Sequence, residues 1–164
     1  MKKTTILFLF ISLTAFSQKS IKEVLKKYNS ESVAYISTEQ IKSLNPKSSF
    51  LLDARELKEF EVSHIKNAIH VGYNNFDLAT TTKQISNKDA FIVVYCTLGV
   101  RSEDVAEKLK EAGYTNVFNL FGGIVDWKNK GNIVIDNQGK ETQRVHVSSK
   151  FWGKWLKKGR KVYE

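Results

Sequence analysis

The chain has 164 residues and a formal net charge of +9, from 26 lysines and arginines against 17 aspartates and glutamates. This length suffices for one hydrophobic core and not for two. A single cysteine excludes any disulfide within the chain, and a moderate positive charge does not by itself indicate a nucleic acid ligand.

Residues 1–17 have the three regions of a secretory signal peptide. Two lysines precede an apolar stretch at 6–16, which ends in small residues before Gln18. The stretch is short for a bilayer span, which needs about 20 apolar residues. We therefore expect export to the periplasm or the extracellular space after cleavage near Ser17, with an uncleaved membrane anchor as the alternative.

Residues 18–32 form the first predicted element after the signal, a short amphipathic helix. Its apolar side chains fall on one side, with lysines on the other: Ile21, Val24, Leu25 and Tyr28. We expect this helix to cap the main domain, which we place at 33–130.

An apolar strand over 50–53 ends in Asp53 and leads into a charged turn. We expect the Asp53 carboxylate to accept hydrogen bonds from the backbone of a neighbouring loop. Arg55 and Glu59 are four residues apart, the spacing of an ion pair along one helical turn or of an ordinary surface pair. A structural role is favoured for both.

Cys96 follows the most apolar strand of the sequence. The polar segment 74–87 predicts a loop with a short helical turn, and the β-branched and aromatic run 90–95 then predicts a strand buried on both faces. Helical spacing of apolar residues follows over 102–112. The thiol therefore lies in a strand-loop-helix turn at the carboxyl edge of a parallel sheet, where open α/β proteins bind ligands.

The loop after Cys96 has the features of an anion site. Gly99 permits backbone angles that let successive N–H groups turn toward the sulfur. The N-terminus of the following helix and the guanidinium of Arg101 add positive charge. All three favour thiolate over thiol, so Cys96 is predicted to be a nucleophile. The alternative is a small buried apolar residue at a strand end, a common role for a free cysteine.

Gly122 and Gly123 follow another short predicted strand, at 116–121. We expect them where the backbone passes so close to the Cys96 loop that no side chain fits. Trp127 is predicted to pack in the core.

The pattern Cys96-x-x-Gly99-x-Arg101-Ser102 resembles the active-site loop of the rhodanese family of sulfurtransferases. Three further segments resemble family motifs in the same order. They are Asp53-x-Arg55 with Glu59 following, His64-Ile65-x-x-Ala68, and Leu120-Phe121-Gly122-Gly123-x-x-x-Trp127. Together the four motifs span most of 33–130.

The resemblance implies a three-layer α/β fold, with a mostly parallel sheet of about five strands and helices on both faces. It implies a sulfurtransferase in which Cys96 carries sulfur as a persulfide, from thiosulfate or a persulfide donor to a thiol or cyanide acceptor. The implied substrate-binding residues are Thr97, Leu98, Gly99, Val100, Arg101 and Ser102. The implied supporting residues are Asp53, Arg55, Glu59, Gly122 and Gly123.

The sequence departs from the family pattern at two places. Ser63 replaces a glycine before His64, and Lys66-Asn67 stand where Pro-Gly is usual, although asparagine tolerates the left-handed backbone of such a turn. In the loop, Thr97, Leu98 and Val100 are uncharged where thiosulfate-using relatives often carry a basic residue. A donor larger or less charged than thiosulfate is therefore indicated, with Leu98 at the pocket mouth.

Two other functions remain as alternatives. A non-catalytic binding module would keep the fold, but the intact Cys96 and Arg101 count against it. A cysteine phosphatase or arsenate reductase is disfavoured because four residues separate Cys96 from Arg101, whereas a loop around phosphate needs five, and because no resolving cysteine is present.

The C-terminal extension 131–164 contains a basic aromatic segment. Phe151, Trp152, Trp155 and Leu156 fall at helical spacing among lysines, which predicts packing on the domain ahead of contact with anionic lipid or nucleic acid. The expected partners are a small sulfur donor and a thiol acceptor, with no nucleic acid, a possible weak membrane-surface contact and a monomeric state. His64, His70 and His146 are isolated, so neither a metal nor another cofactor is expected.

Overall fold

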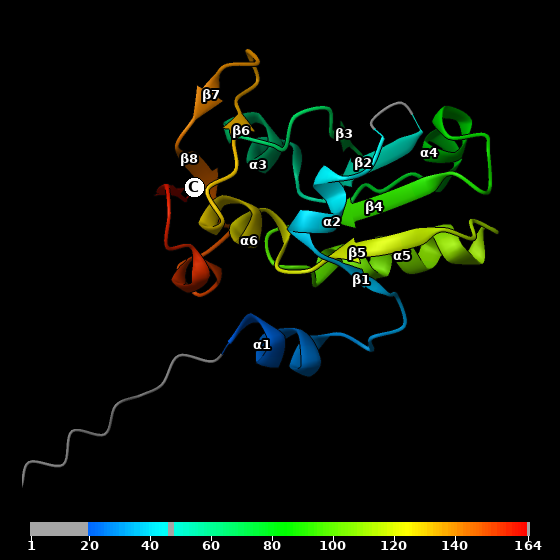
Figure 1. Cartoon of the computed structure of the whole chain (residues 1–164), viewed down its shortest axis with the longest axis horizontal. Coiled ribbons are helices and arrows are strands. Elements are labelled where there is room, and N and C mark those ends of the chain that lie inside the picture. The colour runs from blue at the N-terminus through cyan, green and yellow to red at the C-terminus, as the bar shows by residue number, and fades with distance from the viewer. Residues whose placement is uncertain (1–19, 46–47, 164) are drawn as a thin grey trace, which may run out of the picture.

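A parallel sheet of five strands forms the centre of the computed structural model, which describes residues 20–45 and 48–163 (Figure 1). The strand order is β1-β5-β4-β2-β3, and each neighbouring pair runs parallel. The strands are β1 (Tyr35–Ile36), β2 (Ser49–Asp53), β3 (Ile69–His70), β4 (Phe91–Tyr95) and β5 (Val117–Leu120). The predicted α/β class is confirmed. The predicted signal peptide lies outside the described residues.

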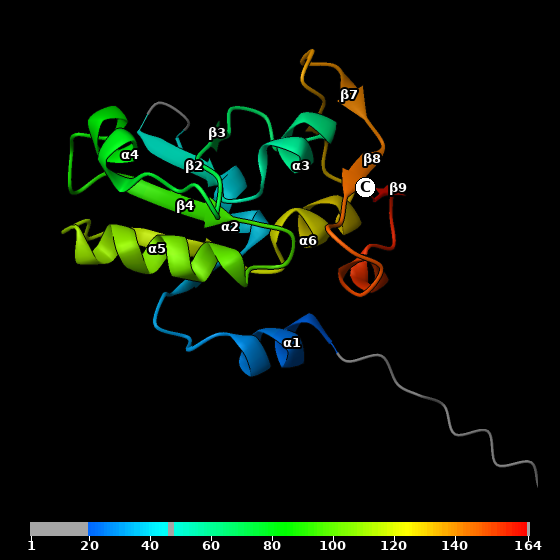
Figure 2. The same ribbon diagram turned by 180° about the vertical axis from the view of Figure 1, so that it is seen from behind.

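Helices cover both faces of this sheet, as a comparison of Figures 1 and 2 shows for α5 and α6. The helices are α1 (Ile21–Tyr28), α2 (Thr38–Lys42), α3 (Leu57–Val62), α4 (Leu78–Gln84), α5 (Arg101–Glu111) and α6 (Gly123–Asn129). Alternate residues of β4 point to opposite faces. Val93 and Tyr95 join one core cluster, with α6, whereas Ile92 and Val94 join the other, with α5. This alternation produces the three predicted layers.

The register of the central strands brings the supporting residues to the thiol. Asp53, the last residue of β2, pairs with Tyr95, the last residue of β4, and Cys96 follows directly. Leu120 ends β5 at the same edge. The loops that leave these three strands therefore meet at the carboxyl edge of the sheet, where the sequence placed the site.

The predicted helix within 18–32 extends from Ile21 to Tyr28. Ser20 and Glu23 form a capping box at its start, in which each side chain bonds to the other residue's backbone N–H. Val24 and Leu25 are buried, and Val24 belongs to the same core cluster as Leu98 of the Cys96 loop. The helix thus packs beside the site.

The segment 74–87 is more ordered than the prediction of a loop with a short helical turn. It contains α4, whose N-terminus is capped by the Asp77 carboxylate, which accepts hydrogen bonds from the N–H groups of Ala79 and Thr80. Threonine is a weak helix former, but Thr81 is buried and packing of this face favours the helix.

The C-terminal extension packs against the sheet and is not a separate unit. It contains β6 (Val134–Ile135), β7 (Glu141–Thr142), β8 (Arg144–His146), the 3₁₀ helix η1 (Trp152–Trp155) and β9 (Arg160–Val162). Five of its buried apolar residues belong to the core cluster of Tyr95 and Leu120: Val134, Val145, Val147, Trp155 and Leu156. The helical spacing predicted around Trp152 is realised as a single 3₁₀ turn.

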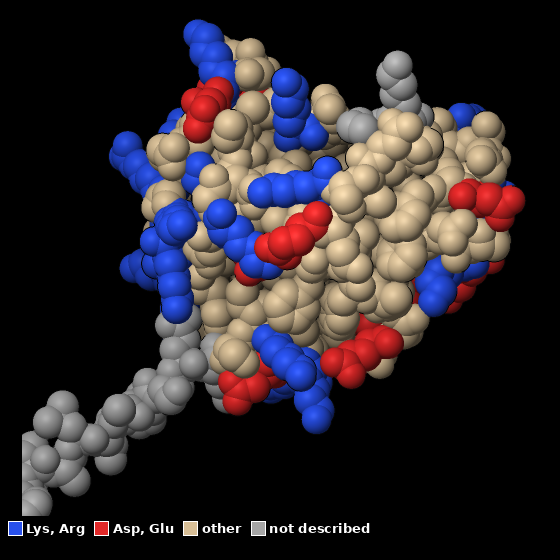
Figure 3. Space-filling model, in the orientation of Figure 1, with Lys and Arg blue, Asp and Glu red and all other residues tan. Residues whose placement is uncertain are grey.

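Basic side chains gather along the edge of the molecule that carries this extension (Figure 3). The lysines of the aromatic segment are exposed, and Phe151 is 43% exposed beside them. Contact of this edge with an anionic membrane stays a prediction. Among the described helices, none is long and apolar enough to cross a bilayer.

Candidate active site around Cys96

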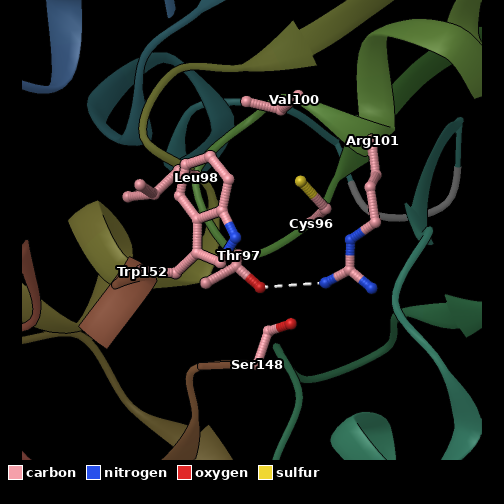
Figure 4. Close-up of a pocket in the computed structure, with 7 residues that line it drawn as sticks. All are labelled: Cys96, Thr97, Leu98, Val100, Arg101, Ser148 and Trp152. Atoms are coloured by element: carbon pink, nitrogen blue, oxygen red, sulfur yellow. Dashed lines mark hydrogen bonds between the residues drawn. The ribbon is translucent and has the colours of Figure 1, made fainter. Parts of the chain in front are cut away.

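The thiol of Cys96 lies at a small cavity where β4 ends. Its side chain is 2% exposed, and the N–H of Gly99 donates a hydrogen bond to Sγ over 3.2 Å. The cavity has a volume of about 130 Å³, and its wall is formed by Cys96, Thr97, Leu98, Val100, Arg101, Ser148 and Trp152 (Figure 4). Leu98 is 1% exposed, so it lies within the wall and not at the predicted place at the mouth.

Two asparagine side chains hold the Cys96 loop in shape. Gly99 has a φ of +113°, and its carbonyl accepts hydrogen bonds from Asn29 and Asn119, each over 2.8 Å. The hydroxyl of Ser102 donates to the oxygen of the same Asn119 over 2.8 Å. Ser102 is therefore a buried support of the loop, whereas the sequence placed it among the substrate-binding residues. Neither asparagine was predicted, because only tertiary contact relates them to Gly99.

The backbone of α6 lies directly against the Cys96 loop, as predicted for Gly123. The prediction is wrong for Gly122, where a Cβ would meet the side chain of Asp126 in α6 and not the loop. The N–H of Ile124 donates to the carbonyl of Cys96 over 3.0 Å, and that of Val125 donates to the carbonyl of Thr97 over 3.2 Å. A Cβ on Gly123 would lie 2.3 Å from the Cys96 oxygen. The approach therefore requires glycine.

Arg101 reaches past the thiol to a buried carboxylate. Its guanidinium donates two hydrogen bonds to Glu59, over 2.7 and 2.9 Å, and a third to the Thr97 hydroxyl over 3.0 Å. Burial acts to lower the pKa of Arg101, but the hydrogen bonds to Glu59 and the neighbouring Cys96 sulfur raise it. Arg101 is thus cationic, and Glu59, itself 2% exposed, balances its charge.

The predicted pairing of Arg55 with Glu59 along one helical turn is wrong. α3 begins at Leu57, so Arg55 precedes the helix, and its guanidinium binds Asp53 over 2.6 Å with both side chains fully buried. The Asp53 carboxylate also accepts the N–H of Arg55, and Arg55 donates to the carbonyl of Ser63. The pair therefore stabilises its own turn, which is a structural role as predicted. The Asp53 carboxylate, however, accepts hydrogen bonds from Arg55 of this turn and not, as expected, from the backbone of a neighbouring loop.

The segment that departs from the family pattern keeps the turn. Asn67 has a φ of +65°, the left-handed conformation expected of a residue that replaces glycine there. Ser63 is fully buried, and its carbonyl receives the hydrogen bond from Arg55.

Two of the three histidines lie beside the Phe60 ring, and the third lies in the C-terminal extension. His64 stacks on Phe60, and His70 bonds through Nε2 to a backbone carbonyl over 2.9 Å. His146 is 3% exposed and accepts the N–H of Ser148 at Nδ1. Across residues 20–45 and 48–163, no three His, Cys, Asp or Glu side chains are grouped to hold a metal ion.

Ser148 and Trp152 complete the pocket and were missed as site residues. Trp152 and Arg101 stand on opposite sides of the Cys96 thiol in Figure 4, with Ser148 facing the same space. The sequence indicated that Trp152 packs on the domain, but it did not indicate which surface of the domain Trp152 contacts. Only the fold shows that the extension passes over the Cys96 loop.

Replacing Glu59 by glutamine is expected to destabilise the protein at neutral pH. Burial raises the pKa of Glu59, but the hydrogen bonds and charge of Arg101, with Arg55, outweigh it and leave this pKa lowered. A lowered pKa stabilises the fold above the ordinary glutamate pKa, and that stability is lost as the pH falls through the folded value. We expect the free energy of unfolding to fall by about 1–3 kcal/mol.

Urea unfolding measured at pH 7 and at stepwise lower pH checks this prediction. The gap between the wild type and Glu59→Gln should close as the carboxylate becomes protonated. Glu61→Gln, on the exposed side of α3, is the matched control and should leave stability nearly unchanged. A gap that persists unchanged in acid would contradict an ionic origin.

Known proteins resemble the chain over the segment that carries Cys96 and Arg101. Residues 37–130 match the family model of the rhodanese-like domain. The thiosulfate sulfurtransferase GlpE of Haemophilus influenzae is 34% identical over 92 residues, which are 56% of this chain and 85% of that protein. A tRNA uridine(34) hydroxylase of Onion yellows phytoplasma is 37% identical over 98 residues, 57% of this chain. The match spans only 32% of that hydroxylase.

Solved structures agree in fold. A thiosulfate sulfurtransferase from Pseudomonas aeruginosa superposes with a TM-score of 0.60 at 19% identity, over 83% of this chain and 25% of that one. A rhodanese-related protein from Thermoplasma volcanium gives a TM-score of 0.52 at 27% identity, over 62% of this chain and 97% of that one. Since residues 37–130 match the family model, the chain belongs to the family of rhodanese-like domains.

Proposed function

We propose that the protein is a sulfurtransferase that carries sulfane sulfur as a persulfide on Cys96. The observation that carries the proposal is the placement of this thiol. It is the only one in the chain, it lies at a cavity of about 130 Å³, and its sulfur accepts the N–H of Gly99. The name of the Haemophilus relative supports the same chemistry.

The first half of the reaction loads the cysteine. The Cys96 thiolate attacks the outer sulfur of a donor, a new S–S bond forms, and the S–S bond of the donor breaks. With thiosulfate the leaving group is sulfite, which departs with the bonding electron pair. The N–H of Gly99 and the cationic Arg101 stabilise negative charge on the sulfur they surround.

The second half discharges the persulfide. The chain has no second cysteine, so the outer sulfur passes to an external nucleophile. Cyanide takes the sulfur as thiocyanate, and a thiol takes it as a new persulfide with its proton retained. In both cases the Cys96 thiolate returns, so the cycle involves no net oxidation of the protein.

The geometry favours this function over the two alternatives. A binding module would not need a cysteine aligned with a loop N–H in a cavity. A phosphatase needs an arginine free to clamp a phosphate, whereas Arg101 gives both ends of its guanidinium to Glu59. The four-residue loop between Cys96 and Arg101 is also short for a tetrahedral dianion.

Intact-mass measurement of the reduced protein tests the proposal. Incubation with thiosulfate, and separately with cysteine persulfide, is expected to add the mass of one sulfur atom. Peptide mapping should place that sulfur on Cys96, and cyanide should remove it. If neither donor adds sulfur to protein whose thiol reacts with iodoacetamide, the proposal is wrong and the binding module becomes the better interpretation.

We also propose that the protein acts after export, on the basis of the charged and apolar pattern of residues 1–17. An exported lone thiol is exposed to oxidation, so its retention in such a compartment is consistent with use. N-terminal sequencing of the protein from the expressing cell tests this, with a first residue near Gln18 expected. An intact Met1 would contradict cleavage.

A further inference from the structure

Two walls of the Cys96 pocket come from outside the family-matched segment 37–130. Ser148 and Trp152 both belong to the C-terminal extension, yet they line the cavity beside Thr97, Leu98 and Val100 (Figure 4). The extension therefore decides part of what can approach the thiol.

The Trp152 ring is held in place by three neighbouring rings. The centroids of Tyr28, Phe151 and Trp155 lie 5.6, 4.9 and 6.2 Å from that of Trp152. Trp155 is 6% exposed and anchors the turn in the core, while Tyr28 comes from α1. Such contacts restrict the indole to one position and make it a fixed wall.

The Ser148 backbone is fixed as well. It has a φ of +63°, uncommon for a residue with a side chain, and its N–H donates to Nδ1 of the buried His146 over 3.1 Å. β8, which ends at His146, pairs with β9, so the turn carrying Ser148 starts from an anchored strand. The hydroxyl is held at the pocket in consequence.

The electrostatics of the pocket suit a donor with little charge. Thiosulfate brings two negative charges, but the one cation of the wall, Arg101, is already paired with Glu59. The remaining polar side chains of the wall are the hydroxyls of Thr97 and Ser148, whereas Leu98, Val100 and Trp152 present apolar surface. A dianion would lose hydration there without an unpaired cation in return.

We propose that Trp152 and Ser148 are specificity-determining residues that select an alkyl persulfide of a low-molecular-weight thiol over thiosulfate. The inference rests on the proposed sulfur transfer. The carbon chain of the donor R–S–SH packs against Trp152 and Leu98 while its outer sulfur meets Cys96. The Cys96–S bond to that sulfur forms, the donor S–S bond breaks, and the proton of R–S–SH leaves with the thiol R–SH. The single negative charge, which lies on the Cys96 thiolate before the step, lies on the Cys96 persulfide after it.

Single-turnover loading with two donors tests the selection. The wild type is expected to have a second-order rate constant for cysteine persulfide at least about tenfold above that for thiosulfate. Trp152→Ala should lower the ratio of the persulfide constant to the thiosulfate constant by about tenfold, and Trp152→Phe should retain most of the preference. Ser148→Gly removes the hydroxyl without straining the left-handed backbone and should lower the ratio less.

Phe118→Ala is the matched control. Phe118 stacks on Phe91, with 4.6 Å between the ring centroids, and it does not line the cavity. It should lose stability comparably while keeping the donor ratio. A ratio unchanged in a folded Trp152→Ala, or a wild type that prefers thiosulfate, would overturn the inference and leave the sulfurtransferase proposal standing.

Alkylation of Cys96 tests the wall without any sulfur transfer. N-ethylmaleimide is bulkier than iodoacetamide. The ratio of the maleimide rate to the iodoacetamide rate should therefore be lower for Cys96 in the wild type than for an unhindered thiol. Trp152→Ala should raise the maleimide rate selectively by about tenfold. If no donor loads any variant but this selectivity appears, the wall is present and the proposed function fails. Equal acceleration by both reagents would show general opening of the fold and contradict the wall.

Discussion

Cys96→Ser is expected to abolish sulfur transfer while leaving the fold intact. A serine hydroxyl stays protonated near neutral pH and forms no stable bond to sulfur, so the covalent route is lost. We expect turnover with either donor to fall by about 10³-fold or more, the scale of removing the nucleophile from a covalent mechanism. The substitution removes little volume from a residue that is 2% exposed, and the oxygen can still accept the N–H of Gly99. The free energy of unfolding should therefore change by only about 1 kcal/mol.

Rates of thiocyanate formation from cyanide, with thermal unfolding in parallel, measure this prediction. Cys96→Ala serves as a second variant, because it lacks both the nucleophile and the hydroxyl. A folded Cys96→Ser protein that keeps a hundredth or more of the wild-type rate would mean that sulfur is carried elsewhere. Since both variants contain no thiol at all, such activity could not come from another cysteine.

The features that were predictable from the sequence are those set by local pattern. The run before Cys96 alternates between two buried faces, so its composition alone indicated a central strand, and β4 is found there. Gly99 and Asn67 indicated backbone conformations that other residues rarely adopt, and both have a positive φ. Such a conformation is a property of a single residue. The carboxyl edge of the sheet was located correctly from another local pattern, an apolar strand followed by a loop and a helix.

The partners of charged residues could not be predicted in this way. Spacing paired Arg55 with Glu59, but α3 starts two residues after Arg55 and the two side chains separate to other partners. Glu59 meets Arg101 from 42 positions along the chain. An uncertainty of one residue in the start of a helix changes which side chains are paired by spacing. The burial of the Asp53 and Glu59 carboxylates depends on the whole fold and cannot be read from spacing at all.

The contribution of the extension was beyond the sequence for a related reason. An aromatic stripe with lysines around it indicated packing, and Trp155 is buried as that interpretation requires. Which surface it meets depends on the path of 131–147, where short strands leave little periodic signal. Trp152 therefore became a pocket residue only when the fold was known.

Gly123→Ala is expected to disrupt the Cys96 loop and to unfold the protein more easily. A Cβ at this position would lie 2.3 Å from the carbonyl oxygen of Cys96 and 2.7 Å from that of Thr97, and neither backbone atom can yield like a side chain. The φ of +52° adds strain for any residue with a Cβ. We expect the free energy of unfolding to fall by about 3 kcal/mol, the sum of overpacking and backbone strain.

Gly139→Ala separates these two causes, because Gly139 has a φ of +76° and nothing within 4 Å of its Cβ position. It should cost only the backbone strain, about 1 kcal/mol, and keep sulfur transfer. Urea unfolding gives the stabilities, and cyanide-dependent turnover gives the activities. Because α6 donates to the carbonyl of Cys96 itself, displacement of α6 by a methyl group moves the peptide that holds the thiol. The activity of Gly123→Ala should therefore fall by a larger fraction than the fraction of its molecules that are unfolded. Equal stability and activity in the two variants would show that the contact with α6 does not position Cys96.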